Sequence, residues 1–600
     1  MDRDFHYYVT YIAAVTAGWS QGDAQVIAHA AQYVDDCDPD SHSGTAKFTY
    51  ANKEYGIINT CFTNPNSAWL STEADHTVWI PFHFLPGNYQ SKNDRSSGTR
   101  NYLPYNGKTS SGTWRYDDEK KEFFKRLCIP KSYMAELMIN DTGKYCNEPF
   151  FKELVGIRMH VLADTVAHAF YSGMLHWYMN DVIGDVYDYR HGKIEYGPNK
   201  EWSSIPDFRY ESVFYLGHGR IGHIPDYAYC NYTYMPQWNQ EKQQSVYINH
   251  TRNYKMAFRL LVQAMYCLKE KKAFTFGTEY TAGDKNILPI LDGQFTKDIG
   301  FYHEQNDYDK NVDRRCEGYD AILTRLGMGS LPKYDRGKWF NEYKNGTGKN
   351  FVYFNFGAIK HFQMVKEELC SNNITIFDRF RTFDDAALSK ELNKIQTPFY
   401  NEAGVQPESS SENQPEPKDN SNFSVNSLPV DQSIFHFFDF YYDELKASDL
   451  FGTNRSAAFD DLPKWQQLTA ELPTEIIMRT GDVIDCVTLK YGNDTLPAHG
   501  GNGGTARKLT LNTGEYVTRI SGAYGRYWNQ TFITDLMFYT NQGRSIGKLD
   551  TASRYTRFDY PLPAGCMMVC MKGFTNAPTG DPGAVGKEFL SGISLYYKKA

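Results

Sequence analysis

Residues 156–168 read GIRMHVLADTVAH, a pattern that predicts a buried helix with a polar stripe. His160, Asp164 and His168 recur every four residues, so each side chain lies about one helical turn above the last. The residues between them are mostly apolar, and two imidazoles and a carboxylate are costly to bury without partners. A divalent cation such as zinc accepts imidazole nitrogen and carboxylate oxygen together. The alternative is three polar side chains satisfied by hydrogen bonds within a helical core.

Further residues of the types that bind metal ions lie on both sides of this stretch. They are His6 in DFHYY, Asp35 and Asp36 in QYVDD, His83 in PFHF, and His218, His223 and Asp226 in GHGRIGHIPD. Any one of them taken alone is more simply a structural or surface residue. Because these clusters and residues 160–168 all fall before residue 227, in a chain with 16 histidines, they favour a multinuclear metal site.

The composition indicates a multidomain protein. A chain of 600 residues exceeds the size at which one core keeps growing, so about two to four domains are expected. The net charge of −8 gives no general reason to expect nucleic-acid binding. Because the sequence has no run of about 18 uncharged apolar residues, no transmembrane segment is expected.

The amino terminus and the cysteines bear on the compartment. The segment MDRDFHYYVTYIAAVTAGWS lacks the basic start and the unbroken apolar core of a secretory signal, so no classical signal peptide is expected. The 11 cysteines are scattered, with only Cys566 and Cys570 close together, which argues against a disulfide framework. Synthesis in the cytoplasm is therefore expected, and any release would use a non-classical or dedicated secretion route.

Four segments differ in pattern. Residues 1–400 read as mostly helical with long irregular insertions, and Ser20 marks one helix start. Residues 404–430 contain GVQPESSSENQPEPKDNSNFSVNS and are expected to form a disordered linker. A bridging segment with a short helix is expected over 433–471. Alternating strands with glycine turns follow over 472–600 and predict an all-β domain.

The order of the N-terminal motifs resembles the zinc-dependent phospholipase C and S1/P1 nuclease superfamily. The form HxxxDxxxH is closer to its HET-C-like members, and DFHYY and QYVDD also look like an uncharacterised bacterial family. The resemblance implies a mostly α-helical domain with two or three zinc ions, in which the backbone of the N-terminal residue often supplies a ligand. The likeness of QYVDD points to Asp35, with Asp36 as the alternative, and that of PFHF points to His83.

The sequence departs from that superfamily in two places. The last ligand motif of the family is His-x3-Glu or His-x3-Asp. Here the fourth residue after His218 is Gly222, and Asp226 is the third residue after His223, so the sequence does not identify the last ligands. Met1 stands where tryptophan is usual in the family, so the third metal is either held differently or missing. The implied mechanism is attack on phosphorus by a metal-bound water. The carboxylates assigned to catalysis are Asp35, Asp36 and Asp164.

Residues 472–600 resemble jacalin-related lectins, which fold as β-prisms. The segments that carry the likeness are IIMRTGDVIDCVTLKYG, HGGNGG, GEYVTRISGAYG and LMFYTNQGRSIG. The resemblance implies sugar contacts from a glycine-rich loop, here Gly500, Gly501, Gly503 and Gly504, and from a carboxylate in a C-terminal loop. Ser591 stands where that carboxylate is expected, which argues against mannose-type binding. A β-prism kept only for protein docking is the alternative.

Two classes of function follow from these resemblances. The first is a metal-dependent phosphodiesterase, a phospholipase C-like toxin or effector that its lectin domain targets to cell-surface glycans. Its substrate would be a phospholipid or another phosphodiester, with peripheral membrane contact. The second class is a non-catalytic lectin-type toxin or recognition protein with structural metals. A P1-like nuclease is a further alternative, which the net negative charge of the chain disfavours.

Overall fold

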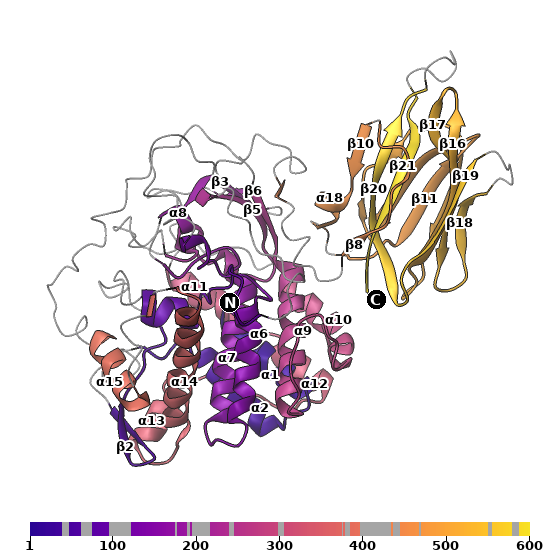
Figure 1. Cartoon of the computed structure of the whole chain (residues 1–600). Helices are drawn as coiled ribbons and strands as arrows, with labels where there is room; N and C mark the ends of the chain where they lie inside the picture. Colours follow the sequence, from indigo (N-terminus) through magenta and orange to yellow (C-terminus); the bar gives the residue numbers. More distant parts are fainter. Residues whose placement is uncertain are drawn as a thin grey trace, which may run out of the picture. The chain divides into compact units, whose positions relative to one another are not determined.

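The chain folds into two compact units, Met1–Leu428 and Pro429–Ala600, in this computed structural model (Figure 1). The residues that the structure describes are 1–38, 47–61, 75–94, 122–174, 177–188, 192–194, 216–238, 245–297, 305–374, 376–377, 384–396, 434–435, 445–455, 457–466, 468, 470–549, 555–578 and 587–599. The linker expected over 404–430 lies outside these residues.

The first unit is mainly helical, as its periodic sequence predicts. Its longer helices are α2 (Gln21–Tyr33), α6 (Tyr133–Thr142), α7 (Phe151–Ala167), α9 (His250–Lys269), α10 (Gly283–Phe295), α11 (Gln305–Cys316), α12 (Tyr319–Leu326), α14 (Asn350–Ser371) and α15 (Asp385–Gln396). Its shorter helical segments are η1 (Asp4–Val9), α1 (Thr10–Thr16), η3 (Asp75–Trp79), α4 (Ile80–Phe82), η4 (Gly143–Tyr145), α8 (Trp177–Asn180), η6 (Gly219–Ile221), η7 (Ile224–Asp226) and α13 (Lys338–Lys344).

Helix α7 is the central helix of this unit. It contacts α2, α14, α9 and α6, and every residue from Glu153 to Ala167 is buried (Figure 1). Gly156 sets how closely α2 approaches, because a Cβ atom there would lie 2.3 Å from the Ile27 carbonyl oxygen and 2.4 Å from Ala30 Cβ. Helix α2 begins where the sequence predicts, since the Ser20 side chain accepts a hydrogen bond from the Asp23 amide. The histidine stripe therefore lies on a helix that is enclosed by other helices.

Two small antiparallel sheets accompany the helices. Strands β1 (Lys47–Tyr50) and β2 (Lys53–Gly56) form a hairpin. Strands β4 (Gly192–Ile194), β3 (Val182–Asp188), β5 (Asn231–Pro236) and β6 (Ser245–Asn249) pair in that order. In this sheet Asn231 pairs with Asn249, directly before α9. The turns η6 and η7 precede β5, with the predicted ligands His218 and His223 as their N-cap residues and Asp226 at the end of η7.

The second unit is all-β apart from α18 (Leu462–Gln466). Its strands are β7 (Ile434–Phe435), β8 (Lys446–Ala447), β9 (Phe451–Gly452), β10 (Ala457–Asp460), β11 (Glu475–Thr480), β12 (Ile484–Tyr491), β13 (Asp494–Thr495), β14 (His499–Gly500), β15 (Thr505–Thr510), β16 (Val517–Tyr527), β17 (Gln530–Thr540), β18 (Ser545–Lys548), β19 (Thr556–Pro561), β20 (Cys566–Asn576) and β21 (Phe589–Lys599).

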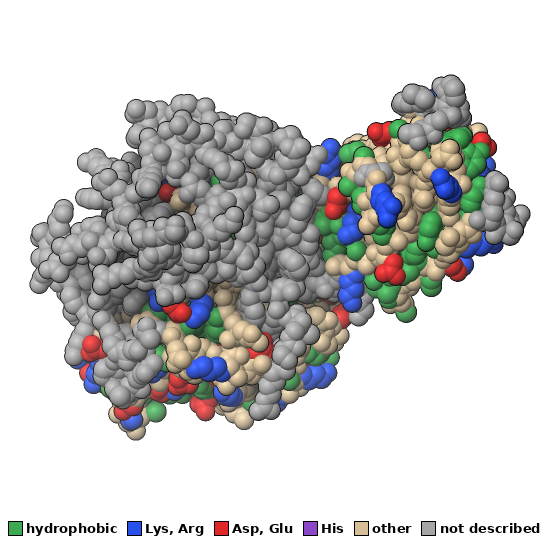
Figure 2. Space-filling view, turned by 45° about the horizontal axis from the view of Figure 1, so that its top comes forward, with side chains coloured by type: hydrophobic (Ala, Val, Ile, Leu, Met, Phe, Trp, Pro, Cys, Tyr) green, Lys and Arg blue, Asp and Glu red, His purple; other side chains and the backbone are tan. Residues whose placement is uncertain are grey.

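Three antiparallel sheets enclose the core of this unit. Their strand orders are β10-β20-β21-β8 with β9 beside β21, β13-β12-β11-β15 with β14 beside β12, and β18-β17-β16-β19. Alternate residues of β11 point into the core, as the period of two predicts. On the face shown in Figure 2, hydrophobic, basic and acidic side chains of this unit are interspersed, so no charge patch of one sign dominates it.

The start of the β unit differs from the prediction. Strands β8, β9 and β10 lie within the segment 433–471 that was expected to be a bridge, and they pair with β21 and β20. Leu462 and Trp465 of α18 are buried in the same core. Short strands of two to four residues show too little alternation to be recognised, because their partners lie more than a hundred residues away. None of the helices in the described part of the chain combines the length and hydropathy needed to span a bilayer.

Candidate functional site

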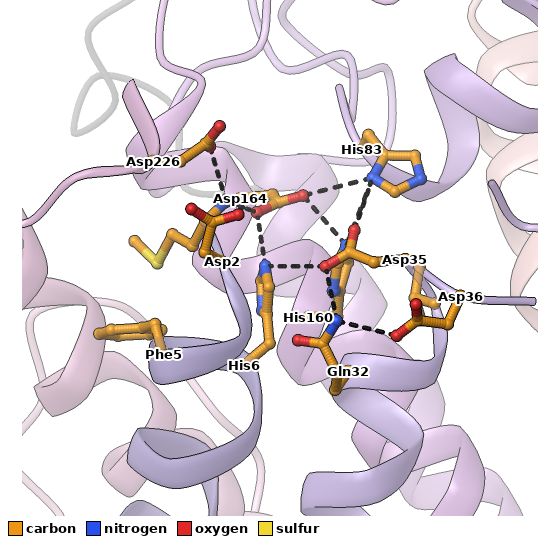
Figure 3. A network of polar contacts seen from close by, with 12 residues as sticks. Asp2, Phe5, His6, Gln32, Asp35, Asp36, His83, His160, Asp164 and Asp226 are labelled. Carbon is orange, nitrogen blue, oxygen red and sulfur yellow. Dashed lines mark hydrogen bonds and ion pairs between the residues drawn. The ribbon is translucent and has the colours of Figure 1, made fainter. Parts of the chain in front are cut away.

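Asp164 lies at the centre of a buried group of histidines (Figure 3). Its Oδ1 atom accepts a hydrogen bond of 2.8 Å from the α-amino group of Met1 and lies 3.2 Å from His6 Nε2. Its Oδ2 atom lies 3.1 Å from His160 Nε2 and 3.6 Å from His83 Nδ1. Because the Asp164 side chain is only 1% exposed, its charge depends on these neighbours rather than on water.

Several separate elements bring these side chains together. Helix α7 supplies His160 and Asp164, one turn apart as the sequence predicts, and its C-cap residue is His168. The π-helical turn η1 supplies His6, and α4 ends at the C-cap residue His83. Asp35 follows the end of α2. The close packing of α2 on α7 is therefore a condition for this arrangement.

Asp35 and Asp36, between which the sequence could not choose, point in different directions (Figure 3). The Asp35 Oδ1 atom lies 3.7 Å from both His83 Nδ1 and His160 Nε2. Asp36 instead accepts a hydrogen bond of 3.0 Å from Gln32 Nε2. Burial and the neighbouring Asp164 charge raise the pKa of Asp35 well above its ordinary value. Asp35 is thus the carboxylate that faces the histidines.

Asp226 organises a second group beside the first. Its Oδ1 atom lies 3.2 Å from His168 Nε2 and 3.2 Å from the Met1 α-amino nitrogen. Its Oδ2 atom accepts a hydrogen bond of 2.9 Å from His223 Nδ1 and lies 3.7 Å from His218 Nε2. The structure therefore brings the three predicted ligands of the GHGRIGHIPD segment to the same site as the HxxxDxxxH stripe.

Backbone carbonyls orient three of the imidazoles. His83 Nε2 donates to the Thr60 carbonyl at 2.8 Å, His168 Nδ1 to the His83 carbonyl at 3.0 Å, and His218 Nδ1 to the Gly222 carbonyl at 2.7 Å. A carbonyl oxygen only accepts, so each of these ring nitrogens carries the proton. The other nitrogen of each ring lies 3.2–3.7 Å from an oxygen of Asp164 or Asp226, an arrangement that is usual for histidine ligands of metals.

At His6, His160 and Asp164 the environment favours neutral imidazoles and an ionised carboxylate. Burial and the neighbouring His160 lower the pKa of His6 well below its ordinary value, and burial lowers the pKa of His160 to about 4. Burial alone would raise the pKa of Asp164, but His168 and the α-amino group of Met1 hold it well below its ordinary value. These are the protonation states that metal ligands require.

Unpaired polar atoms show that the site suits cations. His6 and His160 are both fully buried, and their rings stack with centroids 3.9 Å apart. Within the described residues, the Nδ1 atoms of His6 and His160 have no hydrogen-bond partner, which is costly for buried groups. Ligand atoms within 4.8 Å of one another form four triads: His6, His160, Asp164; Asp35, His83, His160; His168, His218, Asp226; and Asp2, His223, Asp226. The donor set therefore fits a multinuclear site for zinc.

Arg315 anchors the N-terminal segment at this site and was not predicted. Its guanidinium group donates to Asp4 at 2.7 Å and also to Asp2, and it lies over the Tyr227 ring. Arg315 is 4% exposed and belongs to α11. No sequence signal could have revealed this ion pair, because its partners are separated by 311 positions.

In the second unit, the predicted glycine loop closes on Asp485. Gly500 has a φ of +119° and Gly504 a φ of +61°, which favour glycine. Cβ atoms at Gly503 and Gly504 would lie 2.4 and 2.3 Å from the two carboxylate oxygens of Asp485. Asp485 is 4% exposed, and its Oδ2 atom has no hydrogen-bond partner among the described residues. The carboxylate beside the loop is thus Asp485, in the GDVID segment, which the sequence analysis missed.

Ser591 is buried where the resemblance to lectins implies a sugar contact. It lies inside β21, its exposed fraction is 0%, and its carbonyl accepts a hydrogen bond from the Thr453 amide. Strand β9 covers it so closely that a Cβ atom at Gly452 would lie 2.2 Å from the Ser591 carbonyl oxygen. Ser591 is thus fully buried within its strand, which does not favour a sugar contact, and its binding role stays a prediction.

Known proteins resemble the second unit. Residues 448–577 match the jacalin-like lectin domain. Similar solved structures include a mannose-binding jacalin-related lectin from Ananas comosus (23% identity, 26% of this chain and 99% of that chain, TM-score 0.21) and wild-type Malaysian banana lectin (22%, 26% and 99%, 0.21). A mannose-specific jacalin-related lectin from Morus nigra in complex with mannose is similar too (22%, 26% and 95%, 0.21). The all-β unit is thus a jacalin-like domain.

The first unit matches a different kind of family. Residues 1–369 match a family of unknown function, DUF6765, and no curated protein matches the chain. This match gives no support to the resemblance to phospholipases C and P1-type nucleases, which stays a prediction. Because the match covers more than half of its 600 residues, the chain belongs to the family of unknown function DUF6765, and it also carries a jacalin-like lectin domain.

Proposed function

We propose that the first unit is a metal-dependent hydrolase of phosphodiesters that holds two or three zinc ions. The observation that carries this proposal is the crowding of buried imidazoles around Asp164 and Asp226. The residues that would hold the ions are His6, Asp35, His83, His160, Asp164, His168, His218, His223 and Asp226. The positive charge of the Met1 α-amino group compensates only part of the charge of these carboxylates, which favours cations as the remaining partners.

The residues of the chain have distinct tasks in this reaction. Zinc ions, when bound, would supply Lewis acidity and a water of lowered pKa. Asp164 and the carbonyl-oriented imidazoles would hold the ions. Asp35 keeps 27% of its side chain exposed, whereas Asp164 keeps 1%, so Asp35 is the carboxylate that water and substrate reach. Its task is to orient the attacking water by accepting a hydrogen bond.

Removal of metal tests this proposal directly. We expect the purified chain to contain two or three zinc ions by elemental analysis, and to hydrolyse bis(4-nitrophenyl) phosphate or phosphatidylcholine vesicles. Dialysis against a chelator should abolish hydrolysis and lower the melting temperature, because buried carboxylates lose their partners. Added zinc should restore both. Full hydrolysis by a metal-free chain would refute the proposal, and a metal-loaded chain without hydrolysis of any phosphodiester, single-stranded DNA included, would leave only a structural role for the ions.

We also propose that the jacalin-like domain binds cell-surface glycans beside the glycine loop. Asp485 supports this, because a carboxylate accepts charge-assisted hydrogen bonds from sugar hydroxyls. The backbone of the loop can approach a ligand closely, since its glycines have no side chains. The hydrolase would then act at glycosylated membranes, on phospholipid or on another phosphodiester.

Asp485→Asn is expected to weaken glycan binding. The substitution keeps the shape of the side chain but removes its charge, which should weaken affinity by roughly ten- to a hundredfold. Titration calorimetry of the full chain with sugars found on a glycan array gives the measurement. The matched control is Asp494→Asn in the exposed β13, which pairs with the opposite end of β12 and should bind as the wild type does. Equal losses in both variants would contradict a site at Asp485.

A further inference from the structure

Arg315 joins two segments of the first unit that lie far apart in the sequence. Its guanidinium group donates hydrogen bonds to the Asp2 and Asp4 side chains, over 2.7 Å in the case of Asp4. The same group donates to the backbone carbonyl of Asp226 at 3.3 Å, and its central carbon lies 4.8 Å from the centre of the Tyr227 ring. One buried side chain of α11 therefore contacts both the start of the chain and the turn η7.

Each of these two segments carries candidate zinc ligands. The carbonyl oxygen of Asp2 accepts a hydrogen bond of 2.9 Å from the His6 amide, so the position of Asp2 helps to fix that of His6. The turn η7 ends at Asp226, whose carboxylate oxygens face three histidines. Figure 3 shows Asp2 and Asp226 on the side of Asp164 that faces away from His83. Arg315 thus supports one side of the candidate metal centre.

The contacts of Arg315 require a guanidinium group. All three of its nitrogens donate: Nε to the Asn311 side chain at 2.9 Å, and the two terminal nitrogens to the carboxylates and the carbonyl described above. Arginine presents five N–H donors in a rigid plane, whereas the lysine ammonium is a compact group with three donors. A positive charge alone would therefore not reproduce this set of contacts.

The support that Arg315 gives is limited to part of the centre. Asp35, His83 and His160 form a triad of possible ligands, which we call the Asp35 group. Within the described part of the chain, the hydrogen bonds, ion pairs and ring contact of Arg315 involve none of these three residues. Loss of Arg315 should therefore disturb the ligands around Asp226 more than the Asp35 group.

We infer that Arg315 is a positioning residue that sets the zinc affinity of the Asp226 group, which consists of His168, His218 and Asp226. The inference rests on the metal-dependent function proposed above. Arg315 contacts the backbone of Asp226 rather than a ligand atom, so it acts by fixing this segment and does not bind zinc itself. A preorganised ligand loses less conformational freedom when the ion binds, and removal of a residue that orients metal ligands lowers metal affinity by about ten- to a hundredfold.

Zinc titrations of the full chain against a chromophoric chelator test this inference, because they distinguish tightly from weakly bound ions. In Arg315→Met and Arg315→Lys, the affinity for one zinc ion should fall by about ten- to a hundredfold, while the other zinc sites keep the affinity of the wild type. Asp4→Asn removes a partner of Arg315 but no ligand, and it should weaken the same ion. Arg314→Met is the matched control, because Arg314 is an exposed neighbour on α11 and should bind zinc as the wild type does.

A second background identifies the weakened ion. His218→Ala removes one ligand of the Asp226 group and should itself release that ion. If Arg315 acts through this group, Arg315→Lys in the His218→Ala background should cause no further loss of zinc affinity, since residues that act on one site are not additive. Arg315→Lys keeps the buried positive charge, so it gives the same comparison if Arg315→Met does not fold.

The outcomes separate this inference from the proposed function. If the Arg315 variants bind every zinc ion as the wild type does, the positioning role is refuted, although the metal centre stands. If they weaken all zinc ions equally, or weaken zinc further in the His218→Ala background, Arg315 only stabilises the fold. If the wild type binds no zinc, the metal-dependent function fails together with the role of Arg315. Zinc binding that depends on Arg315 in a chain without hydrolytic activity would uphold this inference and refute the hydrolase alone.

Discussion

Asp164→Asn is expected to release the metal ions and to abolish hydrolysis. The asparagine amide has no charge to balance cations. In the wild type, His6 Nε2 and His160 Nε2 face the carboxylate oxygens of Asp164, which only accept hydrogen bonds, whereas the variant places an N–H group at one of these positions. Zinc affinity should fall by about a hundredfold or more. Because the Met1 α-amino group and the neighbouring buried groups lose a charged partner, the free energy of unfolding should fall by about 3–5 kcal/mol. Elemental analysis, hydrolysis rates and thermal unfolding measure the three effects.

Asp36→Asn provides the control for this experiment. Asp36 is an acidic neighbour of the site but is turned toward Gln32, so its variant should keep zinc and hydrolysis. If Asp164→Asn kept the zinc content and the activity of the wild type, the buried stripe would be an ordinary hydrogen-bonded core. If both variants lost zinc equally, the loss would reflect the general acidity of the region rather than ligation by Asp164.

Gly156→Val is expected to destabilise the first unit and to weaken metal binding at the same time. A side chain there would collide with the backbone of Ile27 and with Ala30, so α2 and α7 would have to move apart. Overpacking of this kind costs about 3 kcal/mol. Asp35 follows α2, whereas His160 and Asp164 lie on α7, so separation of the helices also pulls the ligands apart. Calorimetry gives the stability, and competition with a zinc chelator gives the affinity.

Gly22→Ala is the matched control. Gly22 also lies in α2, but a Cβ atom there would meet nothing within 4 Å. Alanine is preferred to glycine in helices, so this variant should be more stable by about 0.5–1 kcal/mol and should bind zinc normally. If Gly156→Val unfolded at the temperature of the wild type, the close approach of α2 and α7 would not be what holds the ligands in place.

Local periodicity explains which parts of the site could be predicted. His160, Asp164 and His168 share one helix, so their spacing alone places them together. The choice between Asp35 and Asp36 depends on the direction in which the chain leaves α2, which no pattern in the sequence encodes. Arg315 escaped prediction for a similar reason, since ion pairs between distant segments leave no local trace.

The β unit shows the same division. The alternation of its longer strands predicted the architecture, because a half-buried strand has a period of two. The burial of Ser591 could not be predicted, because the strand paired beside it, β9, has only two residues and carries no recognisable pattern. Asp485 was overlooked because its position beside the loop depends on pairing between β12 and β14, where Cys486 lies opposite Gly500.

The cysteines of this chain are all free, so no disulfide constrains its fold. The predicted ligands of the metal centre nevertheless come from positions as distant as His6 and Asp226. Zinc bound to them would join remote parts of the chain and lower the conformational entropy of any partly unfolded state, with a gain that grows slowly with the length of the closed loops. A reducing compartment would not break such links. The metal centre would thus act as a cross-link in a protein without disulfides. The supply of zinc would then determine how long the protein resists proteases.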